Sequence, residues 1–246
     1  MEKEYTRFGI NIKGVMGGTL TKAYDIHQTE DFYYSIVGLE LQDFKSYLDD
    51  MILNVKKLKD KLIETDNYAF NFLLSENYEY AHRIDIRYPH LLRNSVFISL
   101  YSLLEDVLLR FFENCNYRLK SNVRLKDKKK LSILSIVFMG IEEVLNYKIP
   151  KSFKEEFSNY RKIRNCIVHK RGYVIWGQKT DENVLNAIYN LSGKGISLSE
   201  NKRGIILDDK ACYIFIKGIE KLFRLLCETL VKTEKSLDST NRNHDI

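Results

Sequence analysis

Proline and cysteine are scarce in this chain of 246 residues. The two prolines, Pro89 and Pro150, each stand just before a long helical pattern, where a missing N–H costs nothing and the fixed φ suits a first helical turn. The cysteines form neither a C-x-x-C pair nor a Cys/His ligand cluster; they are Cys115, Cys166, Cys212 and Cys227. The sequence therefore predicts a reduced, cytoplasmic protein that holds no metal and no other cofactor.

Long apolar runs and a strong net charge are also lacking. The most apolar stretch, residues 131–141, is too short and too often interrupted by serine to span a bilayer, and the N-terminus has no apolar core of signal-peptide length. The net charge of +6 permits a polyanionic partner without requiring one. With 44% hydrophobic and 29% charged residues, the chain can bury one sizeable core, so we expect a globular protein outside the membrane.

Apolar residues that recur every three or four positions predict an all-α bundle. The expected helices cover about 39–65, 89–119, 131–147, 150–169 and 208–237. Residues 196–207 are typical of two short strands, a small β-hairpin before the last helix, and residues 172–195 of irregular chain. We divide the chain into an N-terminal hairpin or loop cap (1–37), a domain of four to five helices (38–237, with an insertion at 172–207) and a disordered tail (238–246).

The expected helix over 150–169 ends in the motif Arg164-Asn165-Cys166-Ile167-Val168-His169. This R-N-x-x-x-H pattern resembles the signature of the HEPN superfamily. The segment from Arg93 to Glu105 is similar to the long second helix of that family, so the resemblance covers about residues 40–235 in its order of helices. It implies a HEPN-like helical bundle, a homodimer with a composite active site, and metal-independent RNA cleavage by a bacterial toxin or antiviral defence protein. An antitoxin or another protein would regulate it.

Arg164 lies on the face of its helix that should be buried. At about 100° per residue, it shares one stripe with Phe157 and Tyr160. A buried guanidinium needs a partner, and Glu105 is an acid on the apolar side of the preceding long helix. We expect Glu105 to pair with Arg164, either within a catalytic site or as an ion pair that only fixes how the two helices dock.

His169 lies about 140° around an ideal helix from Arg164, so one straight helix would not direct both side chains at the same phosphate. Two arrangements would remove this difficulty. Either the last turn unwinds before Gly172, or, as the resemblance implies, two copies of the motif face each other across a dimer. The non-catalytic alternative is a surface histidine at a helix C-terminus, stabilised by the helix dipole.

RNA cleavage without a metal needs a base for the 2′-hydroxyl, an acid for the 5′-oxygen and positive charge near the phosphorane. His169 serves as base or acid because imidazole side chains titrate near neutral pH, and the fork of Arg164 binds two phosphate oxygens. Asn165 orients the histidine or a phosphate oxygen, unless it is an ordinary surface amide. The neighbouring cations track the RNA backbone or form a solvated basic face; they are Arg161, Lys162, Lys170 and Arg171.

Two functions from other classes fit the same residues. A non-catalytic HEPN scaffold would dimerise or bind a partner through its basic groove, and a nucleotide-binding sensor would hold a mononucleotide. Because a fold does not determine a function, the helical bundle itself does not separate these alternatives from a ribonuclease.

Overall fold

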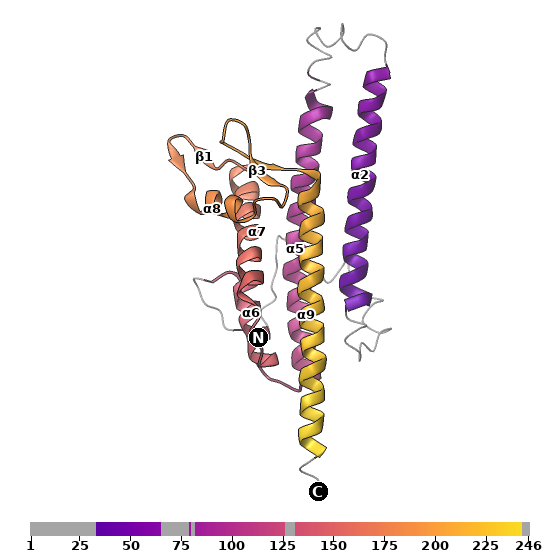
Figure 1. Cartoon of the computed structure of the whole chain (residues 1–246), viewed down its shortest axis with the longest axis vertical. Coiled ribbons are helices and arrows are strands. Elements are labelled where there is room, and N and C mark those ends of the chain that lie inside the picture. The colour runs from indigo at the N-terminus through magenta and orange to yellow at the C-terminus, as the bar shows by residue number, and fades with distance from the viewer. Residues whose placement is uncertain (1–32, 65–78, 80–81, 126–130, 243–246) are drawn as a thin grey trace, which may run out of the picture.

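The computed structural model describes residues 33–64, 79, 82–125 and 131–242. In this part of the chain the fold is all-α, as the sequence predicts (Figure 1). The α-helices are α2 (Leu39–Glu64), α5 (Tyr88–Arg118), α6 (Ile133–Leu145), α7 (Lys151–Lys170), α8 (Glu182–Asn190) and α9 (Asp209–Arg242). Two π-helical turns, η2 (Tyr33–Gly38) and η3 (Arg83–Arg87), lead directly into α2 and α5.

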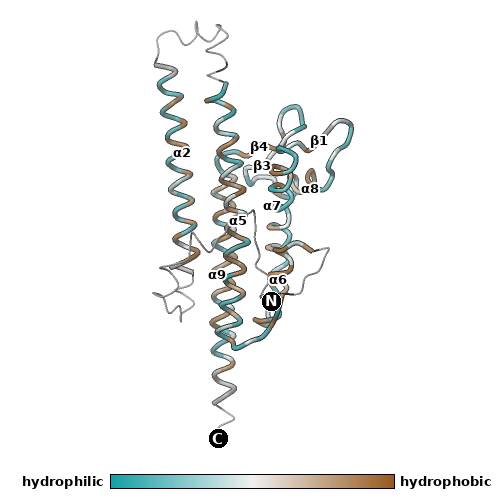
Figure 2. Tube along the Cα trace, turned by 180° about the vertical axis from the view of Figure 1, so that it is seen from behind, coloured by the Kyte–Doolittle hydropathy of each residue, from teal (hydrophilic) through white to brown (hydrophobic). Residues whose placement is uncertain are grey.

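Helix α5 forms the centre of the bundle and contacts α2, α6, α7 and α9. It runs beside α9, with α2 on one side and α6 and α7 on the other (Figure 1). Figure 2 shows hydrophobic residues recurring along both α5 and α9. Fully buried rings join three helices: the centroid of Phe215 of α9 lies 5.2 Å from Phe97 of α5 and 4.4 Å from Tyr160 of α7. Burial of each such side chain contributes about 1.5–3 kcal/mol, so this cluster fixes α7 against the bundle.

A buried carboxylate holds the turn between α6 and α7. Helix α6 ends at Asn146, which adopts the left-handed conformation typical of a helix C-cap. Glu142, only 8% exposed, accepts a hydrogen bond from the N–H of Ile149 at 2.8 Å and pairs with the ammonium of Lys154 at 2.5 Å. Because these partners lie just before and just after the start of α7, Glu142 fixes the direction in which α7 leaves the turn.

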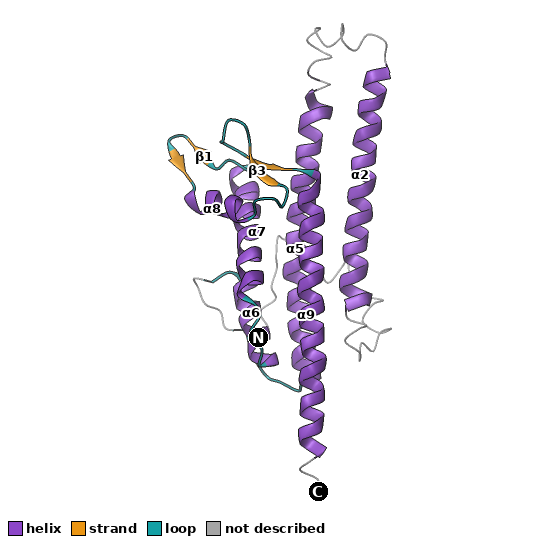
Figure 3. Cartoon of the chain, viewed as in Figure 1, coloured by secondary structure: helices purple, strands orange, loops and turns teal. Residues whose placement is uncertain are grey.

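Residues 172–207 form a small lobe at one end of the bundle (Figure 3). The N–H of Ile205 donates to the carbonyl of Gly172 at 2.9 Å, and Tyr173 pairs with Gly204, so the two ends of the lobe are joined. Helix α8 packs against α7. The lobe contains this helix and two antiparallel hairpins, β1 (Ile175–Trp176) with β2 (Lys179–Thr180), and β3 (Ile196–Leu198) with β4 (Ile205–Leu207).

Gly195 allows the chain before β3 to pass close to the start of α9. Its φ is +76°, and a Cβ at this position would collide with Oδ1 of Asp208 and lie 2.5 Å from the backbone nitrogen of Ala211. Asp208 caps α9, because its carboxylate accepts the N–H groups of Lys210 at 2.8 Å and of Ala211 at 3.1 Å. The lobe and α9 therefore meet at a joint that has no room for a larger residue.

The predicted elements differ from the structure in two places. The prediction that residues 172–195 are irregular is wrong, because they contain β1, β2 and α8. Asp181 starts α8 by accepting the N–H of Val184 at 3.2 Å, and the helix is too short for its apolar pattern to stand out in the sequence. Helix α9 continues to Arg242, beyond the expected start of a disordered tail at 238.

The predicted hairpin is present in the structure, whereas most of the predicted N-terminal cap cannot be compared with it. The hairpin expected over 196–207 is confirmed by β3 and β4. Most of the expected N-terminal cap, residues 1–32, lies outside the described residues, and so do residues 243–246.

Candidate functional site

Arg164 lies half-buried between α7 and α5. Its Nη1 donates a hydrogen bond to Oδ1 of Asn165 at 3.1 Å, and its guanidinium carbon lies 5.8 Å from the ring centroid of Tyr101 on α5. Its Nε is buried and has no hydrogen-bond partner in the described part of the chain. A cation over an aromatic face is stabilised by about 0.5–2 kcal/mol, so Tyr101 and Asn165 hold the guanidinium while one donor stays unused.

Glu105 lies on α5, the helix on which it was expected. The carboxylate is buried, 8% exposed. Arg164 contacts Asn165 and the ring of Tyr101, which stands one helical turn before Glu105 on the same helix. The pairing of Glu105 with Arg164 stays a prediction.

His169 lies exposed in the last turn of α7, and that turn is regular. The helix continues through Lys170, Arg171 takes a left-handed conformation with φ 53°, and the N–H of Gly172 donates to the carbonyl of Cys166 at 3.0 Å. The alternative in which the last turn unwinds is therefore wrong. The angular separation of Arg164 and His169 remains within one chain, and a composite site across a dimer stays a prediction.

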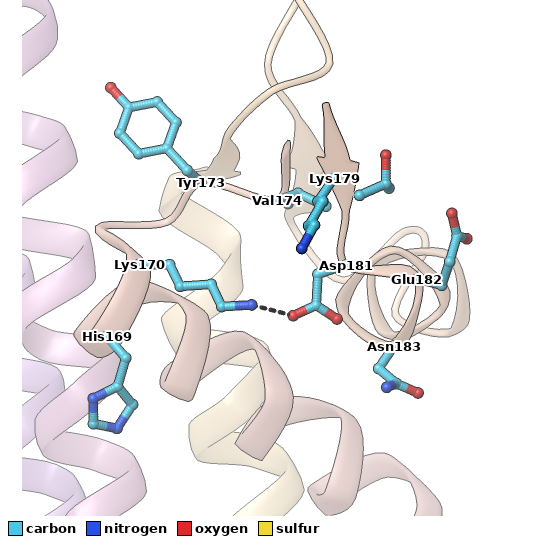
Figure 4. A pocket seen from close by; sticks show the side chains of 9 residues that line it. His169, Lys170, Tyr173, Val174, Lys179, Asp181, Glu182 and Asn183 are labelled. Carbon is cyan, nitrogen blue, oxygen red and sulfur yellow. Dashed lines mark hydrogen bonds and ion pairs between the residues drawn. The ribbon is translucent and has the colours of Figure 1, made fainter. Parts of the chain in front are cut away.

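An open cleft of 690 Å³ lies beside the C-terminal end of α7 (Figure 4). His169 and Lys170 line it from the helix, Tyr173 from the lobe, and β2 and the start of α8 from the far side. Nζ of Lys170 pairs with Oδ2 of Asp181 across this cleft at 2.5 Å. The hydrogen bond to Lys170 lowers the pKa of Asp181, and the same bond raises the pKa of Lys170. The cleft therefore carries an exposed imidazole next to an established ion pair.

The four predicted RNA-binding cations do not share one surface. Lys170 lines the cleft of His169 but is already paired with Asp181. Lys162 lines a different cleft, beside the first half of α7, and contacts Asn159. Arg161 is half-buried, whereas Arg171 is exposed. The basic residues of the motif therefore lie on at least two different surfaces of α7.

Sequence analysis missed the contribution of the lobe to this cleft. Asp181 and Lys179 line it, although residues 172–195 were expected to be irregular. The available signal was an aspartate before the apolar positions of a short helix, which is typical of an N-cap.

Cys166, inside the motif, is buried and donates its thiol to the carbonyl of Tyr173 at 3.3 Å. Burial raises the pKa of this thiol to about 11, so Cys166 stays protonated near neutral pH and acts as a packing residue. Among the described residues, no three His, Cys, Asp or Glu side chains are grouped as metal ligands.

Comparisons with family models, with curated proteins and with solved structures give no match. None of the helices described above combines the length and the apolar character that crossing a bilayer requires. Any function of the chain is therefore argued from its motif and from the geometry around α7.

Proposed function

We propose that this protein is a metal-independent endoribonuclease that acts as a homodimer, in the cytoplasm, as a toxin or antiviral effector. One observation carries the proposal: the R-N-x-x-x-H motif ends a regular helix, and its histidine is exposed beside an open cleft. An antitoxin or another regulatory protein would restrain such an activity. The setting follows from the resemblance to HEPN proteins.

The proposed reaction is attack of the RNA 2′-oxygen on the adjacent phosphorus. His169 removes the proton of the 2′-hydroxyl, and the O2′–P bond forms while the P–O5′ bond breaks. The imidazolium of His169 formed in this way then gives the proton to the leaving 5′-oxygen. Arg164 stabilises the charge of the phosphorane with two N–H groups, and Asn165 keeps the guanidinium in place. The products are a 2′,3′-cyclic phosphate and a 5′-hydroxyl end.

A dimer can bring an arginine and a histidine of the motif to the same phosphate, which one straight helix cannot do. Because α7 is regular through Lys170, Arg164 and His169 of one chain point in different directions, whereas Arg164 of one copy and His169 of another can face a shared phosphate. The open cleft beside His169 leaves room for RNA. In this arrangement each of the two sites takes its arginine and its histidine from different protomers.

The first test is cleavage of RNA by purified protein in excess chelator. We expect His169→Ala to reduce the rate about a hundredfold or more, since it removes a general acid–base group. Val168→Ala, a change at an exposed neighbour in the same turn, should keep full activity. Arg164→Lys keeps the charge but loses the fork, so its rate should fall while the fold is retained. Equal cleavage by the wild type and His169→Ala, or cleavage by neither, contradicts the proposal.

Subunit mixing tests the composite site. Arg164→Ala and His169→Ala homodimers should each be inactive, yet co-expression should restore about a quarter of wild-type activity, because half of the dimers are mixed and each has one intact site. If arginine and histidine act within one chain, the mixture stays inactive. Size-exclusion chromatography checks that both variants dimerise.

One observation favours a second function, a non-catalytic helical scaffold. The guanidinium of Arg164 already has two neighbours in its own chain, Asn165 and Tyr101, and so contributes to the docking of α7 on α5. If Arg164→Ala and His169→Ala both lower the unfolding temperature and no RNA is cut, the motif has a structural role. Normal folding with loss of cleavage alone supports the ribonuclease.

A further inference from the structure

A second cleft, here called the lysine cleft, lies beside the first half of α7, between α6 and the end of α8. Its volume is 910 Å³, and it shares no lining residue with the cleft of His169. The lining consists of four lysines, three serines, two asparagines, two glutamates and one leucine. Pockets for apolar ligands are mostly lined by hydrophobic and aromatic side chains. A lining this polar and rich in ammonium groups suits a small, highly charged ligand.

One lysine of the lysine cleft has no carboxylate partner within the described part of the chain. Three of the four are ion-paired, in the pairs Lys151–Glu155 (3.3 Å), Lys154–Glu142 (2.5 Å) and Lys194–Glu156 (2.5 Å). The fourth, Lys162, is half-buried, and its contact among the described residues is Oδ1 of Asn159 at 3.4 Å. An amide oxygen does not neutralise an ammonium group, so Lys162 keeps its full charge available to an anion.

Asn159 provides a second donor at the same place. Its side chain lines the lysine cleft although the residue is only 7% exposed. Oδ1 accepts from Lys162, while Nδ2 has no hydrogen-bond partner in the part of the chain that the structure describes. Nδ2 is not among the buried atoms of the described residues that lack a partner, so it is open to a ligand in the cleft. Nδ2 of Asn159 and Nζ of Lys162 thus form a pair of adjacent donors that lack an anionic acceptor.

The start of α7 adds positive potential to this cleft. The first turn contains no acidic residue, and Pro150 at the N-cap makes no side-chain hydrogen bond to the helix. Lys151 and Lys154 therefore lie at the end of the helix where the peptide dipoles are already positive. A bound anion would offset this unfavourable arrangement, as anions do at other helix N-termini.

We infer that the lysine cleft binds the phosphate groups of a small phosphorylated molecule, held by Nζ of Lys162 and Nδ2 of Asn159. Phosphate oxygens accept from both donors at once, and their negative charge complements the ammonium group of Lys162, which no carboxylate of the described residues offsets. None of the described residues that line the cleft is aromatic, so the site suits phosphates and not a stacked base. The inference does not depend on ribonuclease activity, because the two clefts are separate.

Calorimetric titration of the full chain with pyrophosphate, at ionic strength held constant with KCl, tests this site. The wild type should give saturable binding. Lys162→Ala should weaken the affinity about tenfold or more, and Asn159→Asp, which places a carboxylate where a donor stood, should weaken it at least as much. Lys45→Ala, at an exposed lysine of α2 on the other side of the bundle, is the matched control and should bind as the wild type does. Circular dichroism confirms that each variant is folded.

Three results would overturn the inference: no saturable binding by the wild type, equal weakening by Lys162→Ala and Lys45→Ala, or loss of pyrophosphate binding in His169→Ala. A parallel titration with a single-stranded oligoribonucleotide separates the two sources of phosphate. If Lys162→Ala weakens RNA binding while the wild type does not bind pyrophosphate, the cleft belongs to the RNA path and the small-molecule site is excluded. Retained pyrophosphate binding in an inactive His169→Ala variant keeps this test independent of the ribonuclease proposal.

Discussion

The two ends of α7 both carry cations, but the helix dipole acts on them in opposite directions. At the C-terminal end, His169 and Lys170 lie where the dipole is negative, so the helix itself stabilises their positive charge. At the N-terminal end, Lys151 and Lys154 lie where it is positive, and carboxylates from Glu155 and Glu142 offset the repulsion. Basic residues at a helix C-terminus thus need no ligand to account for them, whereas those at an N-terminus need a counter-charge.

This difference changes what supports each proposed site. The site at His169 depends on the R-N-x-x-x-H motif and on the open cleft beside it, because positive charge alone would be expected there without any function. The lysine cleft depends on electrostatics, because Lys162, in the middle of α7, has no counter-charge among the described residues, and the N-terminal end of α7, which lines the same cleft, already disfavours cations. The three substitutions below test whether the two ends differ in this way.

The largest effect is expected at Glu142, the buried carboxylate near the N-terminal end. Glu142→Ala leaves the N–H of Ile149 without its acceptor and Lys154 without its counter-charge, and should lower the free energy of unfolding by about 3 kcal/mol. Glu142→Gln, which keeps an acceptor, should cost less. Urea unfolding followed by circular dichroism measures both. The exposed neighbour Glu143 provides the control, and a loss no greater than that of Glu143→Ala would show that the N-terminal cations need no buried carboxylate.

A smaller effect of opposite sign is expected at Ser152. Ser152→Asp places the missing negative charge in the first turn of α7, at an exposed position that lines the lysine cleft. It should raise the free energy of unfolding by about 0.5 kcal/mol and weaken pyrophosphate binding. Ser152→Asn has nearly the same shape without the charge and serves as the control. Equal stabilisation by both variants would mean that helix capping, and not the dipole, is responsible.

The smallest effect is expected at the C-terminal end, where the helix already stabilises the cations. Asp181→Asn keeps a good N-cap for α8 but removes the charge that faces Lys170. Because Lys170 lowers the pKa of Asp181, the contribution of this carboxylate is present above about pH 4, its unfolded pKa, and is lost as the pH falls through the lower folded pKa.

At pH 7 the unfolding temperature of Asp181→Asn should lie about 1–2 °C below that of the wild type, since exposed ion pairs contribute little. The difference should shrink when scanning calorimetry is repeated below pH 4. A difference that grows as the pH falls would contradict this assignment of the pair.

The long helices could be predicted from the sequence because each buries a continuous apolar stripe. Tyr160 and Phe157 belong to such a stripe on α7, and both are fully buried. The short helix α8 could not be found in this way, since its nine residues depend on packing against α7 and on a cap at Asp181.

The residue types of the candidate site could be predicted from the sequence, but the side chains that these residues contact could not. The position of Arg164 on the buried face follows from helical periodicity, yet its contact with Tyr101 depends on how α5 is rotated against α7. Likewise, Lys162 and Lys170 stand close in sequence but line different clefts, because eight residues span more than two turns of the helix.

The closure of the lobe at its base has an evolutionary consequence. The chain leaves the bundle after α7 and returns to it before α9, and the hydrogen bond between Ile205 and Gly172 ties the exit to the entry. Because the two ends of this insertion are hydrogen-bonded to each other, its hairpin tips can become longer or change in sequence at a modest entropic cost, while the helices on either side stay in place. The hairpin at the rim of the His169 cleft can therefore change in length or sequence while the helical frame stays the same.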